Sequence, residues 1–258
     1  MALSRRRFLL AAGSAAALAA CARTGRHTAS PPSASAGGPA AAGPVPTSTP
    51  PATVPVARGP ARFVHSGPTT GGQMALTFHG SGDVGVVTAL LDVARRVRAP
   101  ITVFAVGQWL EANPAMADRL RADGHELANH TYTHPALASV DRAGVASEIT
   151  RCRDVLARLS GSGGRWFRPS GVDVPTSLML EEAGSAGYGT VVGYDIDPLD
   201  YTDPGAAAVL SRTRAKLHAG AIVSLHTGHQ GTVDAFEPVV AAVRAAGLEP
   251  VVVSELLK

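Results

Sequence analysis

Acidic residues are absent from the first 62 positions of this 258-residue chain. The seven basic residues there are all arginines, at positions 5, 6, 7, 23, 26, 58 and 62. The whole chain holds 23 Lys and Arg against 20 Asp and Glu, so the remainder has a net charge of −4. The isoelectric point of about 9.2 therefore comes from the N-terminal segment. Without a basic stripe on the foldable part, binding to a phosphate backbone is not supported, and we expect no nucleic-acid partner.

The apolar run near the N-terminus, Phe8 to Ala20, falls short of the about 20 residues that a membrane-spanning helix needs. This apolar run follows Arg5-Arg6-Arg7, and a basic segment followed by an apolar segment is typical of an export signal. Ser4 to Leu9 resembles a twin-arginine signal, the address for export of folded proteins. Leu18 to Cys21 resembles a bacterial lipobox, in which Cys21 is lipidated; the alternative is an ordinary cleaved signal with an incidental cysteine. We expect an exported protein that is anchored to the outer face of the cytoplasmic membrane by this lipid, or secreted.

Residues 22 to about 62 show no apolar periodicity and consist mostly of Ala, Pro, Ser, Thr and Gly. Such a segment cannot bury enough apolar surface to offset the entropy of the chain. We therefore predict three parts: an export signal with a lipobox over 1–21, a disordered tether over 22–72, and one folded domain over 73–258.

Cysteine is scarce, since only Cys21 and Cys152 are present. If Cys21 carries a lipid, Cys152 has no partner and no disulfide forms. Cys152 also continues a helical apolar stripe with Val145, Ile149 and Leu156. This pattern indicates a core residue and not a nucleophile.

The folded part alternates segments of strand and helix character. Strands are expected at 74–78, 101–106, 127–129, 189–194, 221–225 and 250–253, and helices at 84–97, 114–122, 141–159, 175–186, 204–217 and 233–246. Sequential β-then-α units imply a parallel sheet with helical crossovers, and about seven of them favour a closed or nearly closed (β/α) barrel. Functional residues of barrels gather at the C-terminal ends of strands. His79, His130, Asp197 and His226 each stand at or just after such an end.

The sequence His130-Thr131-Tyr132-Thr133-His134 is the most informative segment. Two histidines four residues apart lie on one face of a helical turn, so both imidazoles can reach one metal ion.

This segment belongs to a series of motifs that resembles the polysaccharide deacetylases, the NodB-like carbohydrate esterase family 4. Gly124 to His134 resembles the second motif of that family. Phe167 to Gly171 resembles a shortened third motif, Asp197 to Tyr201 the fourth, with Tyr where Trp is common, and Ile222 to His226 the fifth. Ile101 to Gly107 resembles the strand between the first two motifs. The resemblance covers residues 73–258 and implies a distorted (β/α) barrel that removes N-acetyl groups from amino-sugar polymers with a divalent metal ion. We expect this ion to be zinc.

The resemblance also implies roles for single residues. His130 and His134 hold the metal, and His226 is the general acid. Asp197, with Asp200 as the less favoured choice, holds the imidazole of His226 and raises its pKa. Arg168 orients the general base through a charge-assisted pair. A divalent ion suits the chemistry because it polarises the amide carbonyl and lowers the pKa of bound water.

The first motif departs from the family, in which Thr-Phe-Asp-Asp supplies a base and then a metal ligand. Here the residues are Thr77-Phe78-His79-Gly80, followed by Ser81-Gly82-Asp83. In one arrangement Asp83 is the third metal ligand and His79 the base; in a second, His79 is the ligand and Asp83 the base. In a third, neither works, Asp83 caps the next helix, and the protein is an inactive glycan-binding lipoprotein.

Overall fold

The computed structural model of the protein describes residues 59–258. The strands are β1 (Arg62–Val64), β2 (Gln73–Gly80), β3 (Thr102–Ala105), β4 (Glu126–Asn129), β5 (Thr190–Val192), β6 (Ile222–His226) and β7 (Glu249–Pro250). The α-helices are α1 (Val84–Arg96), α2 (Gly107–Ala112), α3 (Ala115–Ala122), α4 (Arg142–Ser160), α5 (Ser177–Ser185), α6 (Ala206–Arg214), α7 (Gln230–Ala245) and α8 (Val253–Leu256). Two 3-10 turns, η1 (Leu137–Ser139) and η2 (Asp200–Thr202), lie between them.

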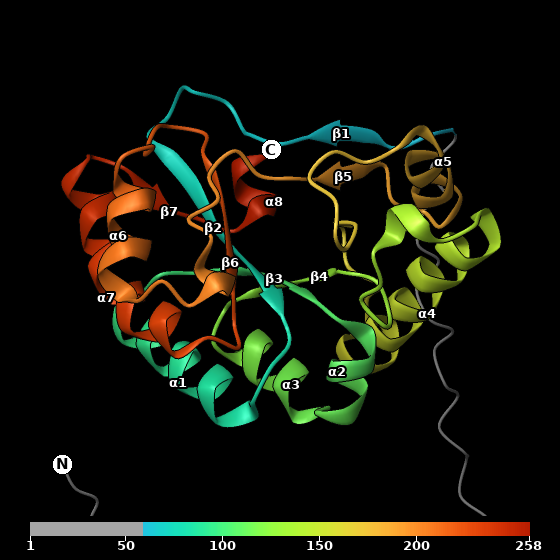
Figure 1. Cartoon of the computed structure of the whole chain (residues 1–258), viewed down its shortest axis with the longest axis horizontal. Coiled ribbons are helices and arrows are strands. Elements are labelled where there is room, and N and C mark those ends of the chain that lie inside the picture. The colour runs from blue at the N-terminus through green and yellow to red at the C-terminus, as the bar shows by residue number, and fades with distance from the viewer. Residues whose placement is uncertain (1–58) are drawn as a thin grey trace, which may run out of the picture. The chain divides into compact units, whose positions relative to one another are not determined.

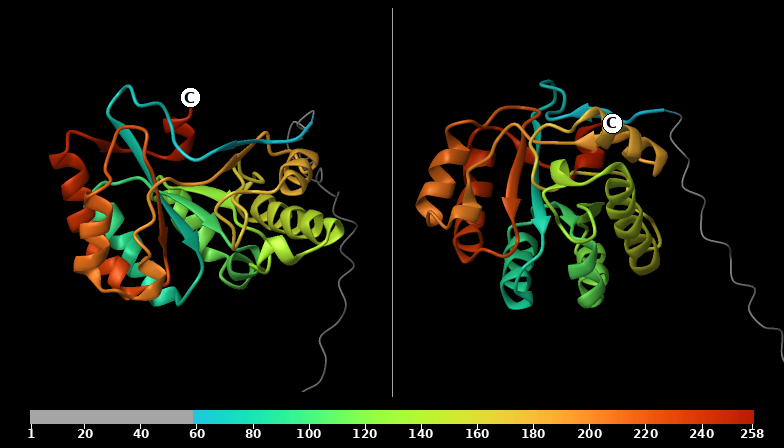
Figure 2. Two further views of the ribbon diagram at one scale, coloured as in Figure 1. Left: turned by 45° about the horizontal axis from the view of Figure 1, so that its top comes forward. Right: turned by 45° about the vertical axis from the view of Figure 1, so that its right-hand side comes forward.

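The strands are parallel and form most of a barrel. Four of them follow the order β4-β3-β2-β6, and β7 pairs with the start of β2. Parallel bridges continue the ring from Asn129 to Phe167, from Phe167 to Val191 in β5, and from Ile196 back to Val223 in β6. Figures 1 and 2 show the helices around the outside of these strands. The predicted class, a distorted α/β barrel of parallel strands, is confirmed.

The core lies between the strands and the surrounding helices, and its segments were predictable from their apolar pattern. In β2, Leu76 and Phe78 are fully buried, and Phe78 meets Phe236 of α7 edge-on at 5.5 Å between ring centres. Cys152 of α4 is fully buried, and burial raises the pKa of its thiol to about 12. The prediction that Cys152 is a core residue is confirmed.

The N-terminal boundary of the folded part differs from the prediction. We expected a disordered tether up to residue 72, but Arg62–Val64 form β1, which pairs in parallel with β5 (Figure 1), and Ala61 is buried. The alternation of side chains in so short a strand is too weak to recognise in a Pro- and Gly-rich context. The predicted signal over 1–21 and the tether over 22–58 lie outside the described residues.

Two further elements correct the prediction. The expected strand at 250–253 is only Glu249–Pro250, and α8 begins at Val253. Helix α2 was not predicted, because its six residues are too few to show a helical period. Among residues 59–258, no helix has the length and apolar character needed to cross a membrane.

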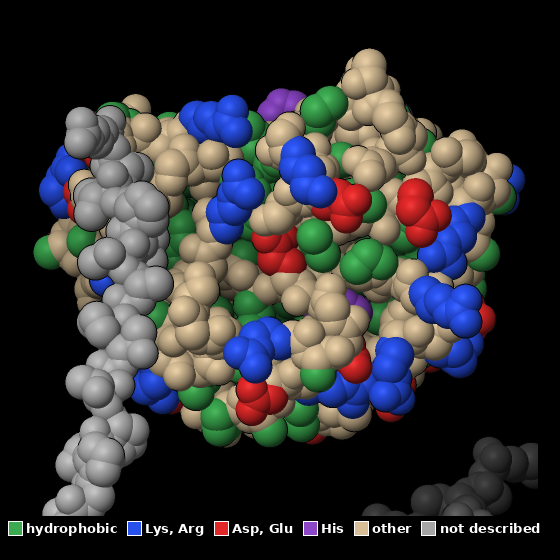
Figure 3. Space-filling model, turned by 180° about the vertical axis from the view of Figure 1, so that it is seen from behind, with side chains coloured by type: hydrophobic (Ala, Val, Ile, Leu, Met, Phe, Trp, Pro, Cys, Tyr) green, Lys and Arg blue, Asp and Glu red, His purple; other side chains and the backbone are tan. Residues whose placement is uncertain are grey.

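Charged side chains of both signs are interspersed on the face that Figure 3 shows. Exposed ion pairs join separate elements, such as Arg96 of α1 with Glu237 of α7 at 2.7 Å, and Arg119 of α3 with Asp92 of α1 at 2.7 Å. Each exposed pair of this kind contributes about 0–1 kcal/mol, so the barrel is held mainly by its core.

Candidate active site

The two histidines of the His130–His134 segment converge without a helix. His130 follows β4 directly and is fully buried, and residues 131–136 are irregular. Thr131 and His134 have φ angles of 67° and 62°, in the left-handed region that non-glycine residues rarely adopt. The predicted helical turn is therefore wrong, and two left-handed residues bring the rings together, with centroids 4.8 Å apart. Strain of this kind is retained where the surroundings fix it, often at functional sites.

A buried carboxylate fixes this loop. Glu148 of α4 accepts hydrogen bonds from the backbone N–H groups of Tyr132 and Thr133, at 2.8 and 2.7 Å, and from the Thr133 hydroxyl at 2.7 Å. Sequence reasoning missed this residue. The available signal was its position: an acidic side chain lies one residue before Ile149 in the apolar stripe of α4.

His79 is the third histidine at the same place. It lies near the end of β2, in register with Phe104 of β3 and His226 of β6. Its ring centroid is 4.3 Å from that of His130, and one ring nitrogen from each of His79, His130 and His134 lies within 4.8 Å of the others. The structure therefore brings together a three-histidine cluster.

The cluster has the properties of a metal site. Burial, followed by the charges of neighbouring groups, lowers the pKa of His79 and His130 well below the ordinary value, and burial also lowers the pKa of His134. The neutral imidazoles that result are the form that binds a metal. His130 Nδ1 lies 2.9 Å from the carbonyl oxygen of Arg168 and must donate to it, which leaves Nε2 as a buried lone pair without a hydrogen-bond partner. Three neutral imidazoles are a donor set that zinc accepts.

His226 stands beside the cluster and has a carboxylate partner. Its ring centroid is 4.4 Å from that of His79, and its Nδ1 lies 2.8 Å from Oδ1 of Asp200. Asp200 is fully buried. Its Oδ2 accepts hydrogen bonds from the backbone N–H of His226 at 2.8 Å and from the Thr232 hydroxyl at 2.6 Å. A carboxylate held by three donors fixes the imidazole in one orientation.

The partner of His226 is thus Asp200, and the favoured choice of Asp197 is corrected. Oδ1 of Asp197 accepts from the Leu199 N–H at 2.7 Å and organises the turn before η2. Burial, with a contribution from the nearby Asp200 charge, raises the pKa of Asp197. The pairing of Asp200 with His226 depends on how η2 packs on β6, which the spacing of residues does not reveal.

Asp83 is not part of the cluster. Its carboxylate caps α1, accepting from the Gly85 and Val86 N–H groups at 2.8 and 3.2 Å. The preceding loop packs against neighbouring elements, since Trp109 donates to the Gly82 carbonyl at 2.8 Å and a Cβ on Gly82 would lie 2.5 Å from the backbone of Gly228. The predicted place of Asp83 beside His130 and His134 is therefore corrected, and His79 is the side chain that the structure brings next to them.

Gly80 has no room for a side chain. An ideal Cβ at this position would lie 2.5 Å from Cγ1 of Val103 and 3.1 Å from Cα of Ala105, both in β3. Close packing of the neighbouring strand thus fills the place that a side chain at position 80 would occupy.

Among residues 59–258, Arg168 has no carboxylate partner, so the predicted charge-assisted pair with a base is wrong. The side chain is buried, its Nε and Nη2 donate to the carbonyls of Val192 and Gly193 at 3.0 and 2.9 Å, and Nη1 has no partner. Its guanidinium lies over the ring of Phe104 at 4.0 Å, and burial lowers its pKa to about 9. Arg168 contributes to the site through its backbone carbonyl, which holds His130.

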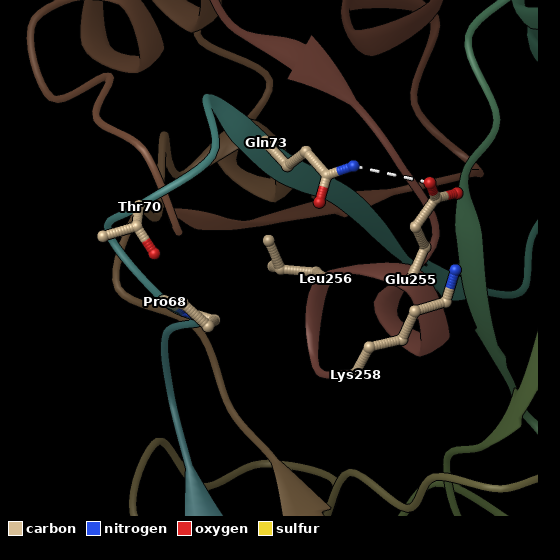
Figure 4. Close-up of a pocket in the computed structure, with 6 residues that line it drawn as sticks. All are labelled: Pro68, Thr70, Gln73, Glu255, Leu256 and Lys258. Carbon is tan, nitrogen blue, oxygen red and sulfur yellow. Dashed lines mark hydrogen bonds between the residues drawn. The ribbon is translucent and has the colours of Figure 1, made fainter.

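A cavity of about 250 Å³ lies away from these residues, between the loop before β2 and the C-terminal helix. Figure 4 shows its lining, in which Gln73 donates to Glu255 at 3.4 Å. None of the histidines of the cluster lines it.

Comparison with known proteins agrees with this geometry. The family model for polysaccharide deacetylase matches residues 66–191. A chitooligosaccharide deacetylase of Bradyrhizobium sp. (strain ANU 289) is 34% identical over 156 residues, which are 60% of this chain and 70% of the relative. The chain belongs to the polysaccharide deacetylase family. The predicted family and its enzyme class, a deacetylase that acts as a hydrolase, are confirmed.

Solved structures extend the likeness. The crystal structure of a peptidoglycan N-acetylglucosamine deacetylase aligns with a TM-score of 0.72 at 25% identity, covering 76% of this chain and 92% of that one. A family 4 pseudoenzyme from Bacillus anthracis aligns with a TM-score of 0.71 at 21% identity, covering 76% of this chain and 69% of that one, and shares the fold.

Proposed function

We propose that this polysaccharide deacetylase removes N-acetyl groups from an amino-sugar polymer, using a divalent metal held by His79, His130 and His134. The observation that carries the proposal is the convergence of three neutral histidines beside the His226–Asp200 pair. The chitooligosaccharide substrate in the name of the Bradyrhizobium relative supports an N-acetylated glycan. Three imidazoles and no carboxylate favour zinc over magnesium or calcium, which prefer oxygen ligands.

A bound zinc ion would polarise the acetamide carbonyl and activate water. The chain's own contribution is proton transfer. Asp200 accepts the Nδ1–H of His226, so His226 Nε2 is the nitrogen that exchanges protons with substrate. It takes a proton from water as the C–O bond forms and gives it to the amine nitrogen as the C–N bond breaks.

One residue performs both transfers in this proposal. Asp83 caps α1, and His79 is taken up by the metal, so neither of the two residues that the first motif offers is the base in this proposal. This arrangement differs from the division between a base and an acid that the family resemblance implies. Each proton transfer contributes roughly 10²–10⁴-fold to the rate.

The proposal includes a place of action outside the cytoplasm. The export signal over 1–21, with Cys21 as the site of a lipid, supports anchoring to the outer face of the cytoplasmic membrane, or secretion if the signal is simply cleaved. A cell-wall glycan is then the substrate within reach.

The test is metal-dependent acetate release by the mature protein from N-acetylglucosamine oligomers. We expect about one zinc per chain, loss of acetate release after chelation and recovery with added zinc. His226→Ala should keep the zinc and lose release by 10²-fold or more, whereas His130→Ala should lose both. Release that survives chelation, or that His226→Ala leaves intact, would contradict the proposal.

A second candidate is a glycan-binding protein without catalysis. It is favoured by the absence, at residues 79 and 80, of the two aspartates of the family's motif. In this case the zinc-loaded protein would bind the oligomers in calorimetry without releasing acetate, and His226→Ala would leave the binding unchanged.

A further inference from the structure

Ser224 lies directly against the third histidine of the cluster. It belongs to β6, two residues before His226, so both side chains point to the same side of the strand. Ser224 is almost fully buried, and its Oγ is 3.1 Å from Nε2 of His79. In the register of the sheet, Ser224 is the neighbour of Thr77 in β2.

This contact restricts which nitrogen of His79 can bind a metal. In a neutral imidazole one ring nitrogen carries the proton and the other carries a lone pair. A hydrogen bond at one nitrogen therefore fixes whether the opposite nitrogen has the proton or the lone pair. Nε2 of His79 is engaged by Ser224, which leaves Nδ1 as the nitrogen that can face the cluster. For Nδ1 to bind a metal it must carry the lone pair, so Nε2 must carry the proton and donate it.

We infer that Ser224 is a positioning residue that accepts the Nε2–H of His79 and thereby presents the Nδ1 lone pair as the third metal ligand. This inference rests on the proposed function. Ser224 does for His79 what the backbone carbonyl of Arg168 does for His130, since each oxygen fixes one N–H and frees the opposite nitrogen. Both nitrogens of His79 are then used, and His79 has none left to act as a base.

The role is specific to a histidine at position 79. An aspartate there, as in the family's motif, offers two equivalent oxygens and needs no partner to select one of them. A hydroxyl at position 224 thus has this role beside a histidine at position 79 and would have no such role beside an aspartate.

Zinc affinity of Ser224→Ala, measured by competition with a chromophoric chelator, tests the inference. We expect the dissociation constant to rise about 10–100-fold, as for other groups that orient metal ligands. Ser224→Thr keeps the hydroxyl and should retain most of the affinity. Thr77→Val is the matched control: it removes a buried hydroxyl that donates to the Val223 carbonyl at 2.6 Å on the neighbouring strand, without a bond to a histidine ring.

A second measurement determines which ring nitrogen of His79 carries the proton. Nitrogen-15 spectra of the metal-free wild type, with the His79 signals assigned through His79→Gln, should show the Nε2–H tautomer. The Nδ1–H tautomer would overturn the inference even if Ser224→Ala failed to fold.

The outcomes separate this inference from the proposed function. Unchanged zinc affinity in Ser224→Ala, together with lost affinity in His79→Ala, would overturn the role of Ser224 alone. Unchanged affinity in both variants would show that His79 is no ligand and would overturn the metal centre of the proposed function as well.

Discussion

At the scale of single residues, His226 differs from the three histidines of the cluster because a carboxylate holds it. Asp200 is fully buried with three donors around it, whereas Asp197, three residues earlier, serves the local turn. Proximity in sequence made the two aspartates nearly equivalent candidates. Only the packing of η2 on β6 separates them, because Asp200 is fully buried and Asp197 only partly.

Asp200→Asn should lower the rate of acetate release by about 10²–10⁴-fold while zinc affinity stays near that of the wild type, because the amide no longer stabilises the protonated imidazole of His226. Steady-state kinetics with an N-acetylated oligomer measure the effect. Asp197→Asn is the control and should change the rate by less than about tenfold. Equal losses in the two variants would contradict the assignment.

His125 makes folding stability depend on pH. Burial lowers its pKa from 6.5 to about 4, and its Nδ1 accepts the Ile101 N–H at 3.3 Å. The unfolded chain therefore takes up a proton near pH 6.5 that the folded chain takes up only near pH 4. The free energy of unfolding must fall as the pH is lowered through that window.

Urea unfolding of the metal-free protein at pH 7 and pH 4.5 measures this fall. His125→Asn, which retains an acceptor near the Nδ1 position, should lose less stability between the two values than the wild type. The variant should still lose some stability between pH 7 and pH 4.5, because the pKa values of His79 and His130 are also lowered in the folded protein. A variant that loses as much as the wild type would rule out the contribution of His125.

At the scale of elements, helix α4 holds the loop that carries His134. Glu148 receives three hydrogen bonds from Tyr132 and Thr133, and bonds to an ionised group are worth about 1.5–3 kcal/mol each. Glu148→Gln should destabilise the protein by about 2 kcal/mol and weaken zinc binding, as measured by urea midpoints and chelator competition. Glu111→Gln, which affects the exposed Tyr132 hydroxyl, is the control. If it weakened zinc binding as much as Glu148→Gln does, the role of Glu148 in holding the loop would be contradicted.

Strands β2 and β3 are packed too closely for a side chain at position 80. Gly80→Ala should cost about 1–3 kcal/mol of stability, because its Cβ would lie 2.5 Å from Val103. The double variant with Val103→Ala should lose less than the sum of the two single changes, since the smaller residue makes space. Additive losses in a double-mutant cycle would show that the contact does not limit position 80.

Elements were predictable where the apolar residues repeat with a regular helical period over many residues, as in α1 and α4. The loop from His130 to His134 was not, because spacing of four residues is the same whether it comes from a helical turn or from two left-handed residues. β1 was missed for a related reason: three residues gain their structure from pairing with β5, more than 120 positions away.

At the scale of the whole molecule, the parallel barrel followed from the alternation of strands and helices, and with it the gathering of His79, His130 and His226 at one end. The contacts that give these residues their roles did not follow. Ser224 with His79 and Asp200 with His226 depend on strand register, and register is a property of the assembled barrel. A one-residue shift of β6 would turn Ser224 and His226 to the other face of the sheet.

The N-terminal segment should determine where the whole molecule works. Cys21→Ala should move the protein from the membrane fraction to the soluble exported fraction, because the lipid has lost its attachment site. Fractionation of cells followed by immunoblotting measures the change, and acetate release by the purified variant should match the wild type. A variant that remains with the membrane would refute anchoring through Cys21.

The contact between Gly80 and Val103 also limits how the site can be redesigned. An aspartate introduced at position 80 would place its Cβ 2.5 Å from Cγ1 of Val103, where there is no space for it. An engineered carboxylate at this position therefore requires a smaller residue at position 103 at the same time. A library that varies one position at a time would miss such a variant, because each half of the change is tested without the other.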